Sequence, residues 1–406
     1  MNESKADEWT FVPSKNKKKS SSKATNKKRE RQLAKAKHLL NTIHGKDVDV
    51  EDNDNEKNHK DQDEKRKSLI RTIEQCMRDL NNLNNLNNWQ GTQRPVQSTV
   101  NFDMQTLGNS IQEAANINTK DKRKVDEIIC YGIGNFNNSS STSYNAPLIQ
   151  LACVLLLRQT FASKCIDRNR REKIDGDRNQ NGSGNDCVNP HDHDDDVNKS
   201  QNISYEMQQE LVSTVYFEPF IQPMEEKVLA YFHLQVLDKN EHGKRCIDTV
   251  REESVSTHSD KSKFCTLFYM PHCPMRLYSN VLWANWDEEL VMDGRMVLFG
   301  NSFKAYDERI ISSEQKKDKT NAIFPLLAFA IETPVLQSQG NRNHKNSKKS
   351  RIVNDWEDGM SMSMQDLEIS FNDCVIMSFA NDGKLHFPGR PEEYFVDSSG
   401  DGGELI

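Results

Sequence analysis

The sequence is poor in apolar residues and has no long apolar run. Only 35% of its 406 residues are hydrophobic, 28% are charged, and the apolar residues gather in short runs between polar tracts. Polar tracts bury too little apolar surface to offset the entropy of ordering them, so one folded domain fits this length better than two. The longest apolar run, residues 148–157, is too short to span a bilayer, which predicts no membrane association.

Several signatures of catalysis, metal binding and secretion are also missing. The chain has no P-loop, no Gly-x-Ser-x-Gly elbow, no His-Glu-x-x-His pair and no Cys-x-x-Cys pair. Its nine cysteines are scattered, and an odd number without a secretory leader predicts reduced thiols. Because the first residues are polar and charged, no secretory leader is expected, and the thiols indicate a cytosolic or nuclear protein. Four cysteines lie in apolar runs and are expected to be buried: Cys130, Cys153, Cys265 and Cys374.

Charge is unevenly distributed along the chain, which has a formal net charge of -7. Residues 17–37 form a basic arm, which is either a nuclear localisation signal, an RNA-contacting arm or a solvated lysine-rich tail. The only contact with nucleic acid that this pattern allows is through that arm. The acidic run at residues 191–196, His-Asp-His-Asp-Asp-Asp, is predicted to be a solvated loop, since nothing rigid holds its side chains around a cation. No metal site is predicted.

Short apolar runs alternate with helical patterns from residue 125 onward. The order predicts an α/β fold with a Rossmann-like, doubly wound and mainly parallel sheet over residues 125–380. The predicted strands are VDEIICY, STVYFEPF, LQVL, FCTLFYM, MVLFG and DCVIMSFA. Helices are expected between them, at residues 147–161, 223–232, 274–284, 306–312 and 324–331.

The remaining segments are polar, and we expect disorder in most of them. The NNLNNLNNW stretch at residues 81–89 is of low complexity and is predicted to be a linker. The full set comprises a basic and polar N-terminal region at residues 1–120, insertions at about 163–205 and 338–365, and a C-terminal tail at 381–406.

Polar residues collect where the predicted strands end, and ligands of open α/β sheets bind at that edge. Gly132 and Gly134 follow the first strand and suit the approach of an anionic or nucleotide ligand, or else merely form a tight turn. Glu218 ends the second strand, where a ribose hydroxyl needs an acceptor, but it lies far beyond the spacing of a dinucleotide fold. The candidate ligand-binding residues are Gly132, Gly134, Asn135, Glu218, His272, Cys273, Asn285, Trp286, Asn301 and Ser302.

The Pro-His-Cys-Pro sequence after the strand at residue 264 has several interpretations. His272 suits an acid, a base or a ligand, and Cys273 suits a nucleophile or a soft metal ligand. The Cys273-Pro274 pair also matches the short pattern of some haem-responsive sites. The plainer alternative is a hydrogen-bonded histidine at a strand end. Trp286 either stacks on a flat ligand or packs over the sheet edge. Catalytic residues are therefore left unassigned.

The ordered series CYGIGNF, LIQLACVLLL, VYFEPF, LFYMPHCPMRLYSNVLWANW and VLFGNSF resembles the sensitivity-to-red-light-reduced (SRR-like) family. The early EWTFVPSKNKKK is similar to the segment that often precedes that domain. The resemblance covers residues 125–302 and, more weakly, those up to 380. One departure is Glu218-Pro219, where the family usually has Asp-Pro.

The resemblance implies a regulatory protein of circadian and light signalling and of haem biosynthesis, found in the cytoplasm and nucleus. It implies protein partners, allows a small-molecule ligand, and carries no established catalytic residues. The alternative is a nucleotide- or S-adenosylmethionine-dependent transferase, in which the Gly132 loop and Glu218 hold the cofactor and His272 moves a proton. The cofactor itself stays open among a nucleotide, S-adenosylmethionine and haem.

Overall fold

The computed structural model describes residues 53–88, 100–117, 122–137, 143–180, 203–247, 264–310, 316–338, 362–381 and 383–393. All strands among them belong to the unit formed by residues 62–406. The basic arm at residues 17–37 and the acidic run at 191–196 lie outside the described residues.

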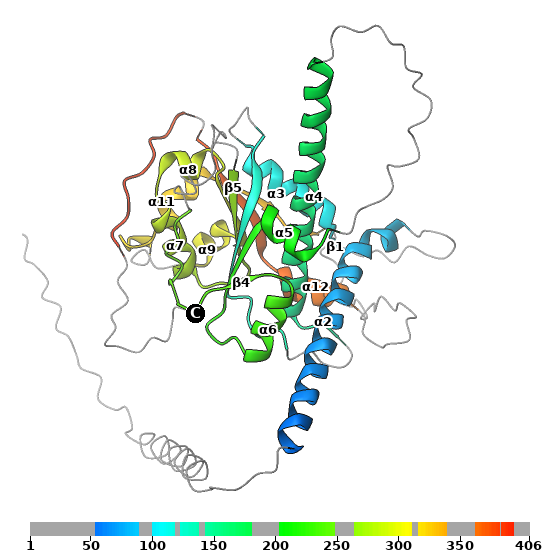
Figure 1. Ribbon diagram of the computed structural model, residues 1–406. Helices are drawn as coiled ribbons and strands as arrows, with labels where there is room; N and C mark the ends of the chain where they lie inside the picture. The colour runs from blue at the N-terminus through cyan, green and yellow to red at the C-terminus, as the bar shows by residue number, and fades with distance from the viewer. Residues whose placement is uncertain are drawn as a thin grey trace, which may run out of the picture. The chain divides into compact units, whose positions relative to one another are not determined.

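Seven strands form one mixed sheet, in the order β4–β3–β2–β5–β6–β9–β7 (Figure 1). Five run parallel: β2 (Lys124–Tyr131), β3 (Ser213–Phe217), β4 (Gln235–Val236), β5 (Phe264–Met270) and β6 (Met296–Asn301). Both β6 and β7 (Ala330–Pro334) pair antiparallel with β9 (Cys374–Phe379), which lies between them. The chain moves from β2 through β3 to β4 and then returns to the other side of β2 with β5. The predicted mainly parallel sheet is confirmed.

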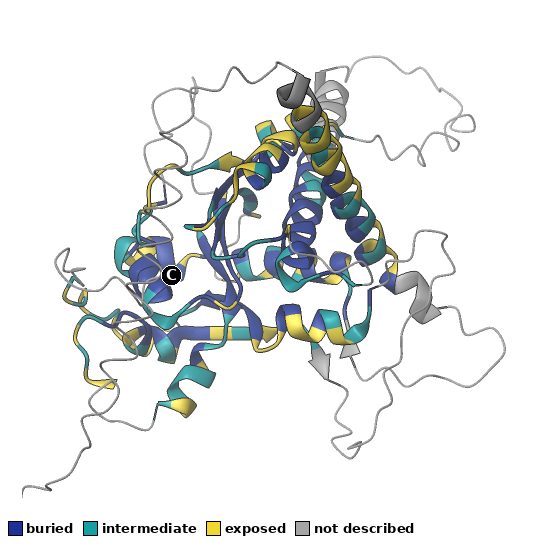
Figure 2. Ribbon diagram, turned by 90° about the horizontal axis from the view of Figure 1, so that it is seen from below, coloured by how far each residue is buried: buried dark blue, intermediate teal, exposed yellow. Residues whose placement is uncertain are grey.

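Both faces of the sheet are apolar, because alternate strand residues enter two separate cores. Ile128 and Cys130 of β2 point into one core, whereas Ile129 and Tyr131 point into the other. Parallel strands that are buried on both faces read as continuous apolar runs, as these do. Figure 2 shows this buried interior in dark blue, with exposed residues on the outer faces of the helices.

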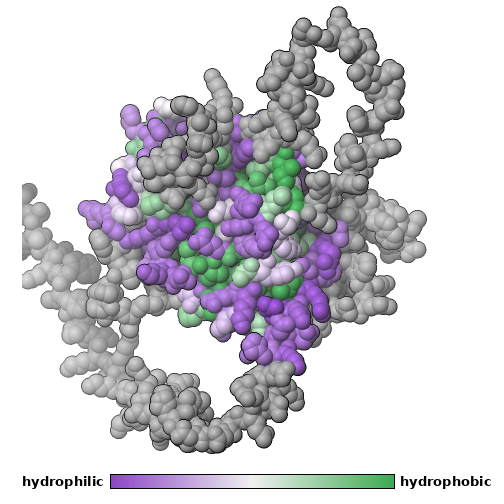
Figure 3. Space-filling model, viewed as in Figure 1, coloured by the Kyte–Doolittle hydropathy of each residue, from purple (hydrophilic) through white to green (hydrophobic). Residues whose placement is uncertain are grey.

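Helices cover each face of the sheet (Figure 1). The first core lies under α2 (Asn53–Asn88), α3 (Met104–Ala115), α4 (Ala146–Gln180), α5 (Tyr205–Leu211), α6 (Pro223–Tyr231) and α12 (Met364–Phe371). The second core lies under α7 (Met275–Ala284), α8 (Glu288–Met292), α9 (Phe303–Arg309), α11 (Ile323–Leu326) and the short η2 (Leu327–Phe329). A two-stranded sheet of β1 (Val100–Asn101) and β8 (Gln337–Ser338) completes the described elements. Hydrophilic residues dominate the face seen in Figure 3, with apolar patches between them.

Residues 53–88 and 100–117 differ from the disorder that was expected over residues 1–120. In α2, Ile73 and Leu80 are buried at helical spacing, and Ile111 of α3 is fully buried in the same core. Their sequence surroundings are polar because each helix buries only one stripe. The predicted linker at residues 81–89 is also corrected, since α2 continues to Asn88 and buries Leu83.

Three further boundaries are corrected. Helix α4 runs to Gln180 and so extends into the insertion expected at residues 163–205. Residues 362–365, expected in the second insertion, include the N-cap and first residues of α12, where Ser363 and Asp366 form a capping box. The helix expected at residues 324–331 ends early, because the chain from residue 330 pairs with β9 as strand β7. Local helical spacing was overridden there by a sheet partner more than forty residues away.

The apolar part of α4, Ala146–Asp167, is long and apolar enough to cross a bilayer by length and composition alone. However, 72% of its most apolar window is buried inside the domain, as in the core helix of a folded protein. Leu148, Leu151 and Leu155 of this helix are completely buried in the first core. Its hydrophobicity is therefore accounted for by packing on the sheet.

Candidate functional site

The two glycines after β2 adopt backbone conformations that favour glycine. Gly132 has φ 64° and Gly134 has φ 89°. A Cβ atom at position 132 would lie 2.9 Å from Sγ of Cys273, and one at position 134 would lie 3.4 Å from Cγ of Pro147. Because these two residues have no side chain, the loop packs closely against the turn that follows β5 and against the start of α4.

Two carboxylates hold the backbone amides of this loop. Glu218, only 7% exposed, accepts a hydrogen bond from the Gly134 N–H at 2.9 Å through Oε2. Glu225 accepts hydrogen bonds from the N–H groups of Phe136 at 2.7 Å and Asn137 at 3.0 Å. Burial raises the pKa of Glu218, against the opposing effect of its hydrogen bonds from the backbone. Three loop amides that an anionic ligand would need are therefore already occupied by acceptors of the same charge.

The turn after β5 holds His272 and Cys273 in different environments. Cys273 is 3% exposed, and its thiol donates to the Tyr131 carbonyl at 3.3 Å. Burial raises its pKa far above the ordinary range, so the sulfur stays a thiol and is a poor nucleophile. His272 is exposed, with φ 56°, and its Nε2 lies 3.0 Å from the carbonyl oxygen of Ser370, to which it donates.

Asn301 connects the ends of β5 and β6. Its Oδ1 accepts a hydrogen bond from the His272 N–H at 3.1 Å, and its Nδ2 donates to the Cys273 carbonyl at 3.1 Å and to the Tyr306 hydroxyl at 2.8 Å. The next residue, Ser302, caps α9 and donates through Oγ to Glu332 at 2.7 Å. These residues fix the turn geometry at the carboxyl edge of the sheet.

Asn285 and Trp286 lie at the far end of α7 and do not join this cluster. Asn285 is 2% exposed, and its Oδ1 accepts from the Ile247 N–H at 2.6 Å. Its Nδ2 donates to the Arg245 carbonyl at 3.0 Å. The Trp286 indole N–H donates to the Pro388 carbonyl at 3.1 Å, so the tryptophan packs on the protein's own chain.

Eight of the ten candidates therefore lie along the carboxyl edge: Gly132, Gly134, Asn135, Glu218, His272, Cys273, Asn301 and Ser302. Asn135 belongs to the same loop, where its Oδ1 accepts from the Asn137 N–H at 3.0 Å. The sequence analysis missed Glu225, although Gln222-Pro-Met-Glu225 is a capping-box pattern that places an acid at the start of α6. Among the described residues, no three His, Cys, Asp or Glu side chains are grouped to hold a metal ion.

The fold and this edge define a mainly parallel α/β domain whose strand-end residues are tied together by a polar network. The chain belongs to the SRR1 domain family, whose model matches residues 96–169 and 200–378, more than half of the sequence. The resemblance predicted from the motifs is confirmed. The match begins before residue 125 and includes α3, in agreement with the packing of that helix.

Curated relatives are similar to part of the chain. An SRR1-like protein of Mus musculus is 33% identical over 96 residues, 24% of this chain and 32% of the relative. Protein SENSITIVITY TO RED LIGHT REDUCED 1 of Arabidopsis thaliana is 35% identical over 121 residues, 29% of this chain and 38% of the relative. An SRR1-like protein of Drosophila melanogaster is 28% identical over 121 residues. The alignments span about a third of each relative's length, and no solved structure matches the chain.

Proposed function

We propose that this protein is a regulatory member of the SRR1 family that acts in light or circadian signalling, through a ligand or protein partner bound at the carboxyl edge of its sheet. Family membership and the name of the Arabidopsis relative support the signalling role. The chemistry of the edge favours binding over catalysis. Cys273 is a buried neutral thiol, and the carboxylate of Glu218 is engaged by backbone amides. The resemblance extends the proposal to haem biosynthesis, although burial of Cys273 argues against direct haem ligation by its sulfur.

We further propose that the sheet is Rossmann-like, with its ligand at the point where the strand order reverses. The order β4–β3–β2–β5–β6 agrees with the first five positions of the doubly wound arrangement, and the reversal falls between β2 and β5. The glycine loop and Glu218 lie at the ends of β2 and β3, and Cys273 follows β5. The reversed strand β9 is the departure from that arrangement.

The hydrogen bonds of the loop amides favour one class of cofactor over another among those that the sequence left open. Glu218 and Glu225 occupy the loop amides that would otherwise hold a phosphate, so a phosphorylated nucleotide would meet negative charge at close range. The Glu218 carboxylate can accept further hydrogen bonds besides those from the loop backbone, and the hydroxyls of a ribose without phosphates can donate them. This favours S-adenosylmethionine over a dinucleotide, and it supports the transferase as the second candidate function.

The test combines complementation with ligand identification. Glu218→Gln and His272→Ala are introduced into cells that lack the gene, with Glu289→Gln, an exposed carboxylate on α8, as the matched control. We expect the first two to reduce a light-entrained reporter rhythm and the control to restore it fully. Mass spectrometry of the purified protein is expected to find an adenosine derivative without phosphates. Full rescue by both edge variants would refute a functional role for this edge.

The basic arm carries a separate proposal about location. We propose that residues 17–37 direct part of the protein to the nucleus, the remainder staying in the cytoplasm. Neutralising the lysines of this arm is expected to shift a fluorescent fusion towards the cytoplasm while leaving the melting temperature unchanged. An unchanged distribution would leave the arm as a solvated tail.

A further inference from the structure

Two tryptophans near the end of α7 bind a proline-containing segment, residues 388–391, that lies more than 100 residues further along the chain. The Trp283 indole N–H donates to the Pro391 carbonyl at 3.1 Å, and the Trp286 indole N–H donates to the Pro388 carbonyl at 3.1 Å. Residues 388–391 read Pro-Gly-Arg-Pro, and residues 386–393 contain neither helix nor strand. Sequence analysis had placed this segment in a C-terminal tail, whereas the structure fixes it on the domain.

The Trp283 ring is also contacted by two cations. The guanidinium carbon of Arg390 lies 4.0 Å from the ring centroid, and Nζ of Lys244 lies 5.3 Å from it. Arg390 donates in addition to the Trp283 carbonyl at 2.8 Å. Phe387 packs on the ring of Trp286, with the ring centroids 5.6 Å apart. The segment is thus recognised by side chains, by carbonyl acceptors and by ring stacking.

The spacing of the two hydrogen bonds along the segment matches the repeat of a polyproline II helix. A polyproline II helix has three residues per turn, so the two prolines of a Pro-x-x-Pro segment lie on the same face of the helix, with their carbonyls one turn apart. Trp283 and Trp286 are likewise three residues apart, and each donates to one proline carbonyl. Grooves that bind such segments are lined by aromatic side chains and use the low conformational entropy of proline.

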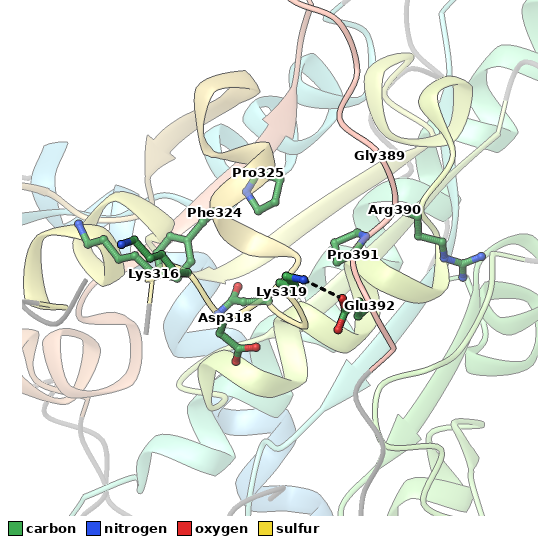
Figure 4. Close-up of a pocket in the computed structure, with 11 residues that line it drawn as sticks. Lys316, Asp318, Lys319, Phe324, Pro325, Gly389, Arg390, Pro391 and Glu392 are labelled. Carbon is green, nitrogen blue, oxygen red and sulfur yellow. Dashed lines mark ion pairs between the residues drawn. The ribbon is translucent and has the colours of Figure 1, made fainter. Parts of the chain in front are cut away.

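On its other side the segment is attached through one residue. Gly389, Arg390 and Glu392 are exposed, the Glu392 N–H donates to the Lys319 carbonyl at 3.0 Å, and the Glu392 carboxylate forms an exposed ion pair with Lys319 at 3.4 Å. Pairs of this kind contribute little to stability. Residues 389–392 and the chain at residues 316–325 together line a cavity of about 480 Å³, and Figure 4 shows the Lys319–Glu392 ion pair that joins the two segments. A segment with exposed residues and a cavity beside it opens at lower free energy than the core of the domain.

We propose that Trp283, Trp286 and Lys244 form a docking surface for a proline-rich segment of a partner protein, and that the chain's own residues 388–391 cover this surface until the partner displaces them. The fitting segment has the pattern Pro-x-Arg-Pro followed by acidic residues. The arginine stacks on Trp283, and the acids pair with lysines as Glu393 pairs with Lys244 at 2.5 Å.

A labelled peptide of residues 385–393 is the probe, and its binding to the full chain is measured by fluorescence anisotropy. In the wild type the covering segment competes, so the apparent dissociation constant equals the intrinsic constant divided by the fraction of uncovered molecules. Pro388→Ala combined with Pro391→Ala weakens the covering segment, and we expect peptide affinity to rise at least about tenfold. His386→Ala, an exposed position in the same segment, is the matched control and should leave the affinity unchanged. Adding Trp283→Phe and Trp286→Phe removes both indole donors, which is expected to lower the affinity about tenfold.

Hydrogen exchange on the wild type gives a second measurement that does not depend on how the variants fold. Saturating peptide should speed exchange of the Glu392 amide, whose N–H donates to the Lys319 carbonyl at 3.0 Å, because the covering segment is displaced. Unchanged exchange, or equal peptide affinity in all variants, would overturn the proposal. Conversion of the double proline variant into a dimer would also overturn it, because the surface would then belong to a second copy of the chain.

Discussion

Gly132→Ala tests how closely the loop after β2 is packed against the turn after β5. At φ 64° an alanine costs about 1–2 kcal/mol, because its Cβ approaches the following carbonyl. The same Cβ would lie 2.9 Å from the Cys273 sulfur, a buried atom that cannot move into solvent. Overpacking of this kind costs about 1–3 kcal/mol. We therefore expect the free energy of unfolding to fall by about 2–5 kcal/mol.

The assay is urea unfolding, with Gly383→Ala as the matched control. Gly383 has φ 79°, but a Cβ at that position meets nothing within 4 Å, so it reports the backbone cost alone. The excess of Gly132→Ala over this control measures the contact with Cys273. Repeating Gly132→Ala in a Cys273→Ala background is expected to remove most of that excess. If Gly132→Ala and Gly383→Ala cost the same within about 0.5 kcal/mol, the close packing described for this loop is wrong.

Four further outcomes are expected. Burial raises the pKa of Glu218, so the folded state binds the carboxyl proton more tightly than the unfolded chain does. The contribution of this proton to the free energy of unfolding is therefore complete below about pH 4.3, the pKa of an unfolded glutamate. It is lost as the pH rises through the raised pKa of the folded state. Glu218→Gln should flatten this part of the stability profile, and an unaltered profile would contradict the burial argument. Asn285→Ala should lower the free energy of unfolding by about 1–3 kcal/mol, since it leaves buried backbone groups unpaired, and a change under about 0.5 kcal/mol would refute that role. His272→Ala should cost less than about 1 kcal/mol because the side chain is exposed, whereas His272→Gly should be more stable than His272→Ala by about 1 kcal/mol, as judged by melting temperature. Alkylation followed by peptide mapping should modify exposed Cys246 well before Cys273, and simultaneous modification would disprove the burial of Cys273.

The six short runs predicted as strands all contain strands of the seven-stranded sheet, whereas β7, expected within a helix, was not predicted. Residues 264–270 and 374–379 are almost entirely apolar, and runs of that length favour strands buried on both faces of a covered sheet. Helices that bury one stripe were harder to predict. In α2 the buried Ile73 and Leu80 stand among charged residues and asparagines, so composition alone reads as disorder. The stability of α2 comes from packing on the rest of the domain, and that information is not present in the sequence of the helix itself.

The candidate site was predictable in its position but not in its contacts. Polar residues after parallel strands meet at one edge by topology, which is why His272 and Asn301 were correctly grouped. Asn285 was wrongly placed with them because it lies on the helix after the same turn, yet α7 carries it ten residues away. The partner of Trp286 lies 102 residues further along the chain, at a distance that sequence pattern does not reveal.

Glycines after a first strand therefore have two meanings that the sequence alone does not separate. A phosphate-binding loop and a tightly packed loop both need left-handed backbone, so Gly132 and Gly134 give the same signal in either case. What distinguishes them is the group that meets the loop amides. Here it is Glu218, 84 residues from Gly134, and a carboxylate in that place makes the loop an acceptor of hydroxyl and cationic groups instead of anions. For the proposed ligand site we therefore expect the charge of the side chain that accepts from the loop amides, and not the glycine pattern, to determine ligand preference.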